Sequence, residues 1–318
     1  MRKILIQIGK LTVSSLLIVI LLHRIGLHTV WQTLRSVHPT WFFSALGLFI
    51  LSHVLGSYQW WRMLKAEHVR LTFRKTVSIY FIGLFFNNFL IGGVGGDFFR
   101  IMDVRRLSGK GAASVSTVFM DRVMGFLVLS SLALLTSPYL IFRKTLPSMF
   151  ETVYLVLLFG WILILSFFFI RRFARLFSWI IRKMMPENLH LKARDVYNNI
   201  YHFGRQRSLF IEVLLISLCV QSSRILMHYF LGKSLGCAVS PVYFFLFVPV
   251  IAIIASLPVS LGGIGLREQS GVLLFGMVGM AAMDAFSMEF LAFIVAVASS
   301  LPGGILFVFR RGEDRRSG

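Results

Sequence analysis

Two short stretches of the sequence place charged side chains where they could bind an anion or transfer a proton. The first, GGVGGDFFR, carries Asp97 and Arg100 directly after four glycines. The second, GGIGLRE, carries Arg267 and Glu268 after a similar glycine pattern. A planar guanidinium suits bidentate contact with a phosphate, whereas a carboxyl group could serve as a general acid or base. Asp97 and Arg100 could instead form a structural pair at a helix end.

Two further groups of polar residues interrupt long apolar stretches. Asp121 and Arg122 lie side by side in VFMDRVMGF, where they could be functional or could form an interfacial pair. Gln221, Arg224 and His228 stand at i, i+3 and i+7, which puts them on one stripe of an otherwise apolar helix. Such a stripe must face the interior of a helix bundle. Arg224 is the stronger candidate for function, because a single histidine is more often a satisfied structural residue.

The composition indicates what kind of element must position these residues. Of 318 residues, 57% are hydrophobic and 14% are charged, whereas soluble domains carry about 25% charged residues. Apolar stretches long enough to cross a bilayer recur along the whole chain. The sequence therefore predicts one polytopic membrane domain over residues 1–318. Its basic, apolar N-terminus has no cleavage site, so we expect an uncleaved first span.

The apolar stretches predict six full membrane spans and leave two segments ambiguous. The predicted spans are 4–22, 40–61, 113–138, 152–170, 209–231 and 288–309. The ambiguous segments are 76–99 and 243–280, and each contains one of the glycine clusters.

The distribution of basic residues favours re-entrant hairpins at both ambiguous segments. If 76–99 crossed the membrane fully, the basic segment 171–207 would lie outside, contrary to the positive-inside rule. If the two segments enter from opposite faces and return, nearly all Lys and Arg residues outside the membrane are cytoplasmic, and so are both termini. Those left outside are Arg24, Arg35, Arg143, Lys144 and Lys233. The net charge of +20 is thus explained by topology, and we expect no nucleic-acid partner.

The order of the predicted segments repeats. Residues 1–145 read span, span, hairpin, span, and residues 146–318 read the same. Because each half has an odd number of crossings, the two halves must point in opposite directions, as in the inverted repeats of many transporters. GGVG and GGIG occupy corresponding places in the two halves. The predicted fold is all-α and integral to the membrane, with six spans and two re-entrant helical hairpins.

The glycine clusters predict a cavity. Irregular backbone at membrane depth is tolerated where protein or water satisfies its polar groups, and a half-helix that begins after such a turn attracts anions. Glycine pairs could alternatively serve close helix packing, and Asn87 and Asn88 could cap or line the first turn. The candidate substrate-binding residues are Asn88, Gly92, Gly93, Gly95, Gly96, Asp97, Arg100, Asp121, Arg122, Arg224, Gly262, Gly263, Gly265, Arg267 and Glu268.

The motifs NNFLIGGVGGDFFR and SLPVSLGGIGLRE, with the Asp121–Arg122 pair between them, resemble the transmembrane region of lysylphosphatidylglycerol synthases and its stand-alone flippase-like relatives. The resemblance covers nearly the whole chain. It implies movement of a lipid between leaflets, and it implies a stand-alone form without the soluble synthase domain. By the same resemblance, the polar residues of the family signature would be Asp97, Arg100, Asp121, Arg122, Arg267 and Glu268. The family more usually has glutamate at the position of Asp121.

The segment 171–207 begins RRFARLFSWIIRKMMP, in which basic residues alternate with large apolar ones in a helical pattern. We expect it to lie in the cytoplasmic interface, with its arginines among anionic headgroups. There it could anchor the bundle or gather anionic lipid near an entrance. The protein is thus expected in the cell (inner) membrane as a multi-pass protein.

Nucleotide-binding and metal-binding motifs are absent from the sequence. There is no phosphate-binding loop of the G-x-x-x-x-G-K-[ST] type and no HExxH, so we expect no cofactor and no metal. We expect a translocase for a lipid with an anionic phosphate headgroup, which Arg100, Arg267 and Arg224 would hold during alternating access. Two alternatives remain open: a lipid-phosphate transferase or phosphatase using Asp97 or Glu268, and a non-transporting partner of a lipid-modifying or envelope-biosynthesis enzyme.

Overall fold

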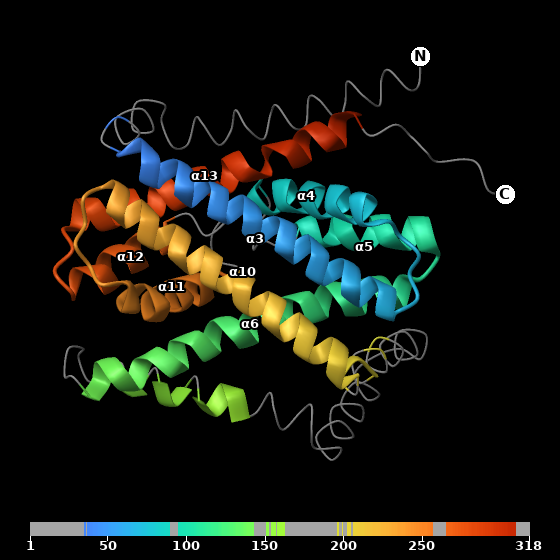
Figure 1. The fold of residues 1–318 in the computed structure, drawn as a ribbon, viewed down its shortest axis with the longest axis horizontal. Coiled ribbons are helices and arrows are strands. Elements are labelled where there is room, and N and C mark those ends of the chain that lie inside the picture. The colour runs from blue at the N-terminus through green and yellow to red at the C-terminus, as the bar shows by residue number, and fades with distance from the viewer. Residues whose placement is uncertain are drawn as a thin grey trace.

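The computed structural model describes residues 35, 37–89, 95–142, 151–152, 154–156, 158–162, 196, 199, 202–204, 206–256 and 265–309. Within these ranges the chain forms helices and no strand (Figure 1). The main helices are α3 (Pro39–Ala66), α4 (Phe73–Phe89), α5 (Gly95–Ser108), α6 (Gly111–Phe142), α10 (Arg207–Ser234), α11 (Pro241–Ala255), α12 (Leu266–Gly276) and α13 (Ala282–Phe309).

Four of these helices, α3, α6, α10 and α13, are long and apolar enough to cross a membrane. They correspond to the predicted spans 40–61, 113–138, 209–231 and 288–309. The predicted span 4–22 lies outside the described residues, and 152–170 is described only in part. Both termini, whose cytoplasmic location is predicted, also lie outside the described residues. Most of the basic segment 171–207 is likewise outside the described ranges.

Helices α3 and α10 run antiparallel through the centre of the molecule, where Figure 1 shows them side by side. At one end the backbone N–H of His38 donates to the carbonyl oxygen of Ser234 at 2.9 Å. At the other end Arg62 and Glu212 form an ion pair of 2.8 Å. The start of each helix therefore lies beside the end of the other.

Two pairs of shorter helices lie at opposite ends of this central pair. Helices α4 and α5 pack against each other, as do α11 and α12. Because α4 follows the end of α3 and α11 follows the end of α10, the antiparallel arrangement separates the two pairs (Figure 1). The segments that join their arms, 90–94 and 257–264, carry Gly92, Gly93, Gly262 and Gly263 and lie outside the described residues.

Glycine allows very close approach between α4 and its neighbours. A Cβ atom on Gly96 would overlap the backbone carbonyl of Gly83, and one on Gly303 would overlap the carbonyl of Phe81. The side chain of Asn87 also accepts a hydrogen bond of 2.7 Å from the Gly96 N–H. Gly96 thus serves close helix packing, and Asn87 caps the start of α5.

The helix contacts of the two halves correspond to each other. Helix α4 packs on α13, and its counterpart α11 packs on α6. In the same way, α5 packs on α6 and α12 packs on α13, while α3 contacts α4 and α6 just as α10 contacts α11 and α13. The second half of the described chain therefore repeats the packing of the first.

Large apolar side chains cover the outer surface of the long helices. Leu135 and Phe142 of α6 and Phe309 of α13 are exposed. Exposed apolar area on this scale is unusual in soluble monomers and is expected where helices face lipid. The polar side chains of the long helices are instead concentrated in the interior, around a cavity.

Candidate functional site

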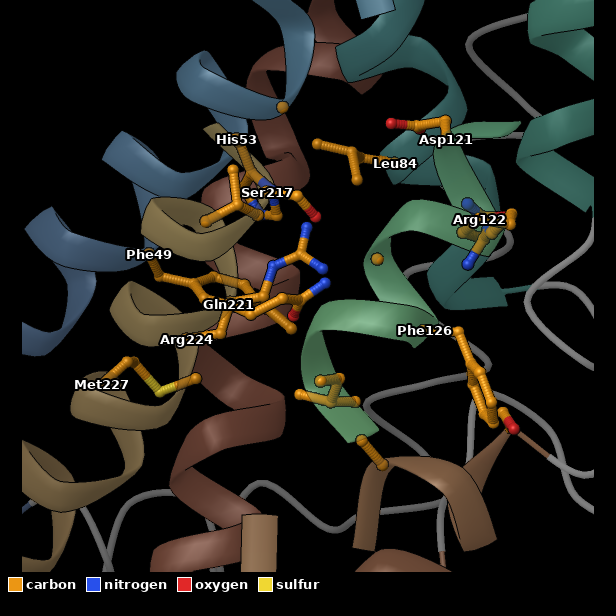
Figure 2. A pocket seen from close by; sticks show the side chains of 18 of the residues that line it. Phe49, His53, Leu84, Asp121, Arg122, Phe126, Ser217, Gln221, Arg224 and Met227 are labelled. Atoms are coloured by element: carbon orange, nitrogen blue, oxygen red, sulfur yellow. The ribbon is translucent and has the colours of Figure 1, made fainter. Parts of the chain in front are cut away.

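A cavity of about 550 Å³ lies at the centre of the bundle, and all eight main helices of the described chain contribute to its wall. Figure 2 shows α10 on one side, with Ser217, Gln221 and Arg224, facing Asp121 and Arg122 on α6. Its volume falls within the range typical of small-molecule sites. The polar lining is therefore positioned to hold a small polar group.

An ion-pair network joins α5 to α6 at one side of this cavity. Arg100 Nη2 lies 2.8 Å from Asp121 Oδ2, and Arg100 Nη1 lies 3.4 Å from Asp97 Oδ1. Asp97 Oδ2 also lies 2.8 Å from Arg122 Nε. Gln59 of α3 donates to the second oxygen of Asp121 at 3.1 Å. Two carboxylates and two guanidiniums thus balance each other's charge.

Arg100 is held firmly within this network. Its guanidinium carbon lies 4.2 Å from the ring centroid of Trp60 and 4.6 Å from that of Tyr80. The residue is only 4% exposed. Cation–π contacts and two carboxylates satisfy its charge. These contacts hold α5 against α3, α4 and α6.

Arg224 is in a different situation. Its side chain extends from α10 toward the middle of the cavity (Figure 2). Its Nε is buried without a hydrogen-bond partner, as is the Nε of Arg100, but Arg224 also forms no ion pair with the residues that the structure describes. A cation at membrane depth is costly unless it has a partner or a ligand. Arg224 is therefore the cation in this wall that is best able to bind an anion.

The second half of the chain contributes a looser cluster. Arg267 Nε lies 4.0 Å from Glu289 Oε2, which also lies 3.6 Å from His228 Nε2. Glu268 makes a different contact: its Oε2 accepts a hydrogen bond from the Gly265 N–H at 2.6 Å and caps the start of α12. Gly265 has φ of 86°, a conformation that favours glycine.

The structure brings some of the predicted site residues together and separates others. The predicted residues that line the cavity are Asn88, Arg100, Asp121, Arg122, Arg224 and Arg267. Asn88 also donates to the Ala296 carbonyl at 3.2 Å and to Ser300 at 2.9 Å, which ties α4 to α13. The predicted residues that are described but do not line it are Gly95, Gly96, Asp97, Gly265 and Glu268.

Sequence reasoning missed several polar residues near the cavity. His53 and Gln59 of α3 and Tyr80 of α4 line it, and Glu289 of α13 is completely buried beside it. Glu289 could have been found, because an acidic residue in a long apolar span is a functional candidate by default. His53 and Gln59 interrupt a predicted span in the same way.

Comparison with known proteins gives one family and one relative. The family described as the lysylphosphatidylglycerol synthase TM region matches residues 7–305. A UPF0104 membrane protein of Pyrococcus horikoshii is 24% identical over 268 residues, which are 78% of this chain and 80% of that protein. No solved structure matches the chain.

Proposed function

This chain belongs to the lysylphosphatidylglycerol synthase TM-region family, and we propose that it is a translocase for lipids with an anionic phosphate headgroup. It would act as a multi-pass protein of the cell (inner) membrane, without nucleotide hydrolysis. The family connects the chain with lipid handling, and its apolar helices make it a membrane protein. The substrate class and the transport step are inferred from the cavity.

The observation that carries the proposal is Arg224, which lies in a cavity inside a membrane bundle and forms no ion pair with the described residues. Arg122 and Arg267 also line the cavity, and their side chains are 54% and 25% exposed. Among the described residues, the carboxylate neighbour of Arg267 is Glu289 at 4.0 Å, so a phosphate could share the charge of this arginine. A volume of about 550 Å³ suits a headgroup and not a whole phospholipid, so the acyl chains would stay in the bilayer.

The short helix pairs would act as re-entrant hairpins. Helices α4, α5, α11 and α12 have 17, 14, 15 and 11 residues. At a rise of 1.5 Å per residue, the longest is ~25 Å, shorter than a hydrocarbon core of ~30 Å. Their location at opposite ends of the α3–α10 pair supports entry from opposite membrane faces. The corresponding contacts of the two halves support an inverted repeat.

Alternating access follows from this arrangement. An inverted repeat lets one half rock against the other while the binding site stays near mid-membrane. Arg100 on α5 and Arg267 on α12 occupy corresponding arms of the two hairpins. We propose that opening at either hairpin exposes the headgroup at Arg224 to one leaflet at a time.

The carboxylates favour binding over covalent chemistry. Asp97 contacts two arginines, and Glu268 accepts a hydrogen bond from the backbone of its own helix. A general base must reach the proton it removes, and these two candidates are engaged elsewhere. We therefore propose that the transported lipid leaves chemically unchanged.

A reconstitution experiment tests this function. The full chain is placed in phosphatidylcholine liposomes with a trace of phosphatidylglycerol or phosphatidylcholine that carries a fluorophore on one acyl chain, and lipid is extracted from the outer leaflet with albumin. With the protein present, labelled phosphatidylglycerol should become extractable from both leaflets. Labelled phosphatidylcholine should be extractable only from the outer leaflet. Protein-free liposomes should release only outer-leaflet lipid of either kind. Mass spectrometry should find the phosphatidylglycerol unchanged. Equal behaviour with and without protein, or a new lipid species, would contradict the proposal.

A further inference from the structure

His228, Arg267 and Glu289 form a second charged group at the wall of the cavity, apart from the Asp97–Arg122 network. Glu289 comes from α13 and is completely buried. Neither of its carboxyl oxygens has a hydrogen-bond partner in the part of the chain that the structure describes. Its nearest charged or titratable neighbours are His228 Nε2 at 3.6 Å and Arg267 Nε at 4.0 Å. A carboxylate in such a position needs a proton or a closely paired cation.

The hydrogen bonding of His228 indicates where a proton would reside. Its Nδ1 lies 2.9 Å from the carbonyl oxygen of Arg224. Because a carbonyl can only accept, Nδ1 must carry a hydrogen. In a neutral imidazole Nε2 is then an acceptor, and it faces Glu289 Oε2. Two acceptors facing each other repel, so one proton bound to either atom would turn this repulsion into attraction.

Among the described residues, the other helices packed around Glu289 add no further ion pair to it. On α12, Gly271 leaves room for the Glu289 side chain, since a Cβ there would meet Glu289 Cγ. On α3, His53 contacts Ser299, and on α4 the uncharged Asn88 contacts Ser300, both more than two turns along α13 from Glu289. Within the described ranges, the charged groups beside Glu289 are thus His228 and Arg267, and Arg224 is one turn further along α10 from His228.

We propose that His228 and Glu289 form a proton-binding site, and that this proton binds together with the anionic headgroup. The inference rests on the anion site proposed above. Without the proton, the Glu289 carboxylate neutralises Arg267. With the proton, the charge of Arg267 is available to a phosphate in the cavity. Because linkage is reciprocal, anion binding must favour protonation by the same factor by which protonation favours anion binding.

Calorimetry measures this coupling directly. The probe is dioctanoyl phosphatidylglycerol, titrated into the full chain in phosphatidylcholine nanodiscs. Its phosphodiester stays ionised from mildly acidic to mildly alkaline pH, so any proton taken up belongs to the protein. Comparing binding heats in two buffers with different ionisation enthalpies gives the number of protons taken up. At alkaline pH, where the free pair holds no proton, we expect probe binding to be accompanied by uptake of close to one proton. There the affinity for the probe should fall by up to about tenfold per pH unit.

Variants assign the proton to the pair. Glu289→Gln should bind the probe with no proton uptake and with affinity independent of pH, because an amide can donate to His228 Nε2 and carries no charge. His228→Gln serves as the second variant if Glu289→Gln does not fold, and it should also abolish uptake. Glu212→Gln, which alters a surface ion pair on α10, should behave as wild type.

The results separate this inference from the proposed function. Absence of probe binding, binding by wild type without proton uptake, or unchanged uptake in Glu289→Gln would overturn the inference. Translocation observed in liposomes would leave the function standing in any of these cases. Conversely, proton-linked binding without translocation would support the site and contradict the function.

Discussion

Replacing Arg224 with glutamine should slow translocation of phosphatidylglycerol by roughly 10- to 100-fold and leave the fold intact. Arg224 has no ion-pair partner among the described residues, so its removal frees no buried carboxylate. A hydrogen bond to a charged group contributes ~1.5–3 kcal/mol, which corresponds to roughly 10- to 100-fold weaker binding of the headgroup. The measurement is translocation in the liposome assay, combined with the thermal unfolding temperature of the purified protein.

Two further variants separate the charge of Arg224 from its shape. Arg224→Lys keeps the charge without the planar fork and should retain partial activity. Lys233→Gln removes a cation from the last turn of the same helix, where Lys233 lies 5.7 Å from the ring of Tyr229, and activity should be unchanged. If Arg224→Gln lowered the unfolding temperature strongly while the surviving protein transported normally, Arg224 would be structural.

Replacing Asp121 with asparagine should, unlike the Arg224 variant, cause a large loss of protein stability. Asp121 contacts the buried Arg100 at 2.8 Å and accepts a hydrogen bond from Gln59. Removal of one partner from a buried ion pair costs ~3–5 kcal/mol, and Asp97, at 3.4 Å from Arg100, should compensate only in part. The expected result is a lower unfolding temperature and less monodisperse protein by size-exclusion chromatography.

A surface pair of equal length provides the matched control. Arg62 and Glu212 also lie 2.8 Å apart, but their side chains are 36% and 28% exposed, against 5% and 11% for Arg100 and Asp121. Exposed pairs contribute less than ~1 kcal/mol, so Glu212→Gln should unfold close to wild type. The double variant Arg100→Met, Asp121→Asn should recover part of the lost stability. Equal unfolding temperatures for Asp121→Asn and wild type would contradict the network.

The long helices and the interior stripe were predictable from sequence because hydropathy and helical period report them directly. Four predicted spans correspond to α3, α6, α10 and α13. The stripe of Gln221, Arg224 and His228 does line the cavity. The family assignment, predicted from the glycine motifs, is confirmed by the match over residues 7–305. Segments such as 4–22 and most of 171–207 stay as predictions.

The division of roles among the arginines could not be predicted from the sequence. Arg100 and Arg267 follow similar glycine motifs. Among the described residues, Arg100 is paired with two aspartates, one of them from α6, whereas Arg267 has a more distant glutamate from α13. These partners lie on other helices, and a single sequence does not reveal which helices meet. The same limitation applies to Gly96, whose packing role depends on Gly83 in the preceding helix.

Cross-linking from the lipid headgroup shows whether a lipid phosphate enters the cavity beside Arg224. A phosphatidylglycerol with a photoactivatable diazirine in its headgroup is incorporated with the full chain in liposomes, irradiated, and mapped by mass spectrometry. We expect labels on the cavity-lining faces of α6 and α10, near Phe126 and Gln221. Labels confined to outward-facing residues such as Leu135 and Phe142 would contradict it.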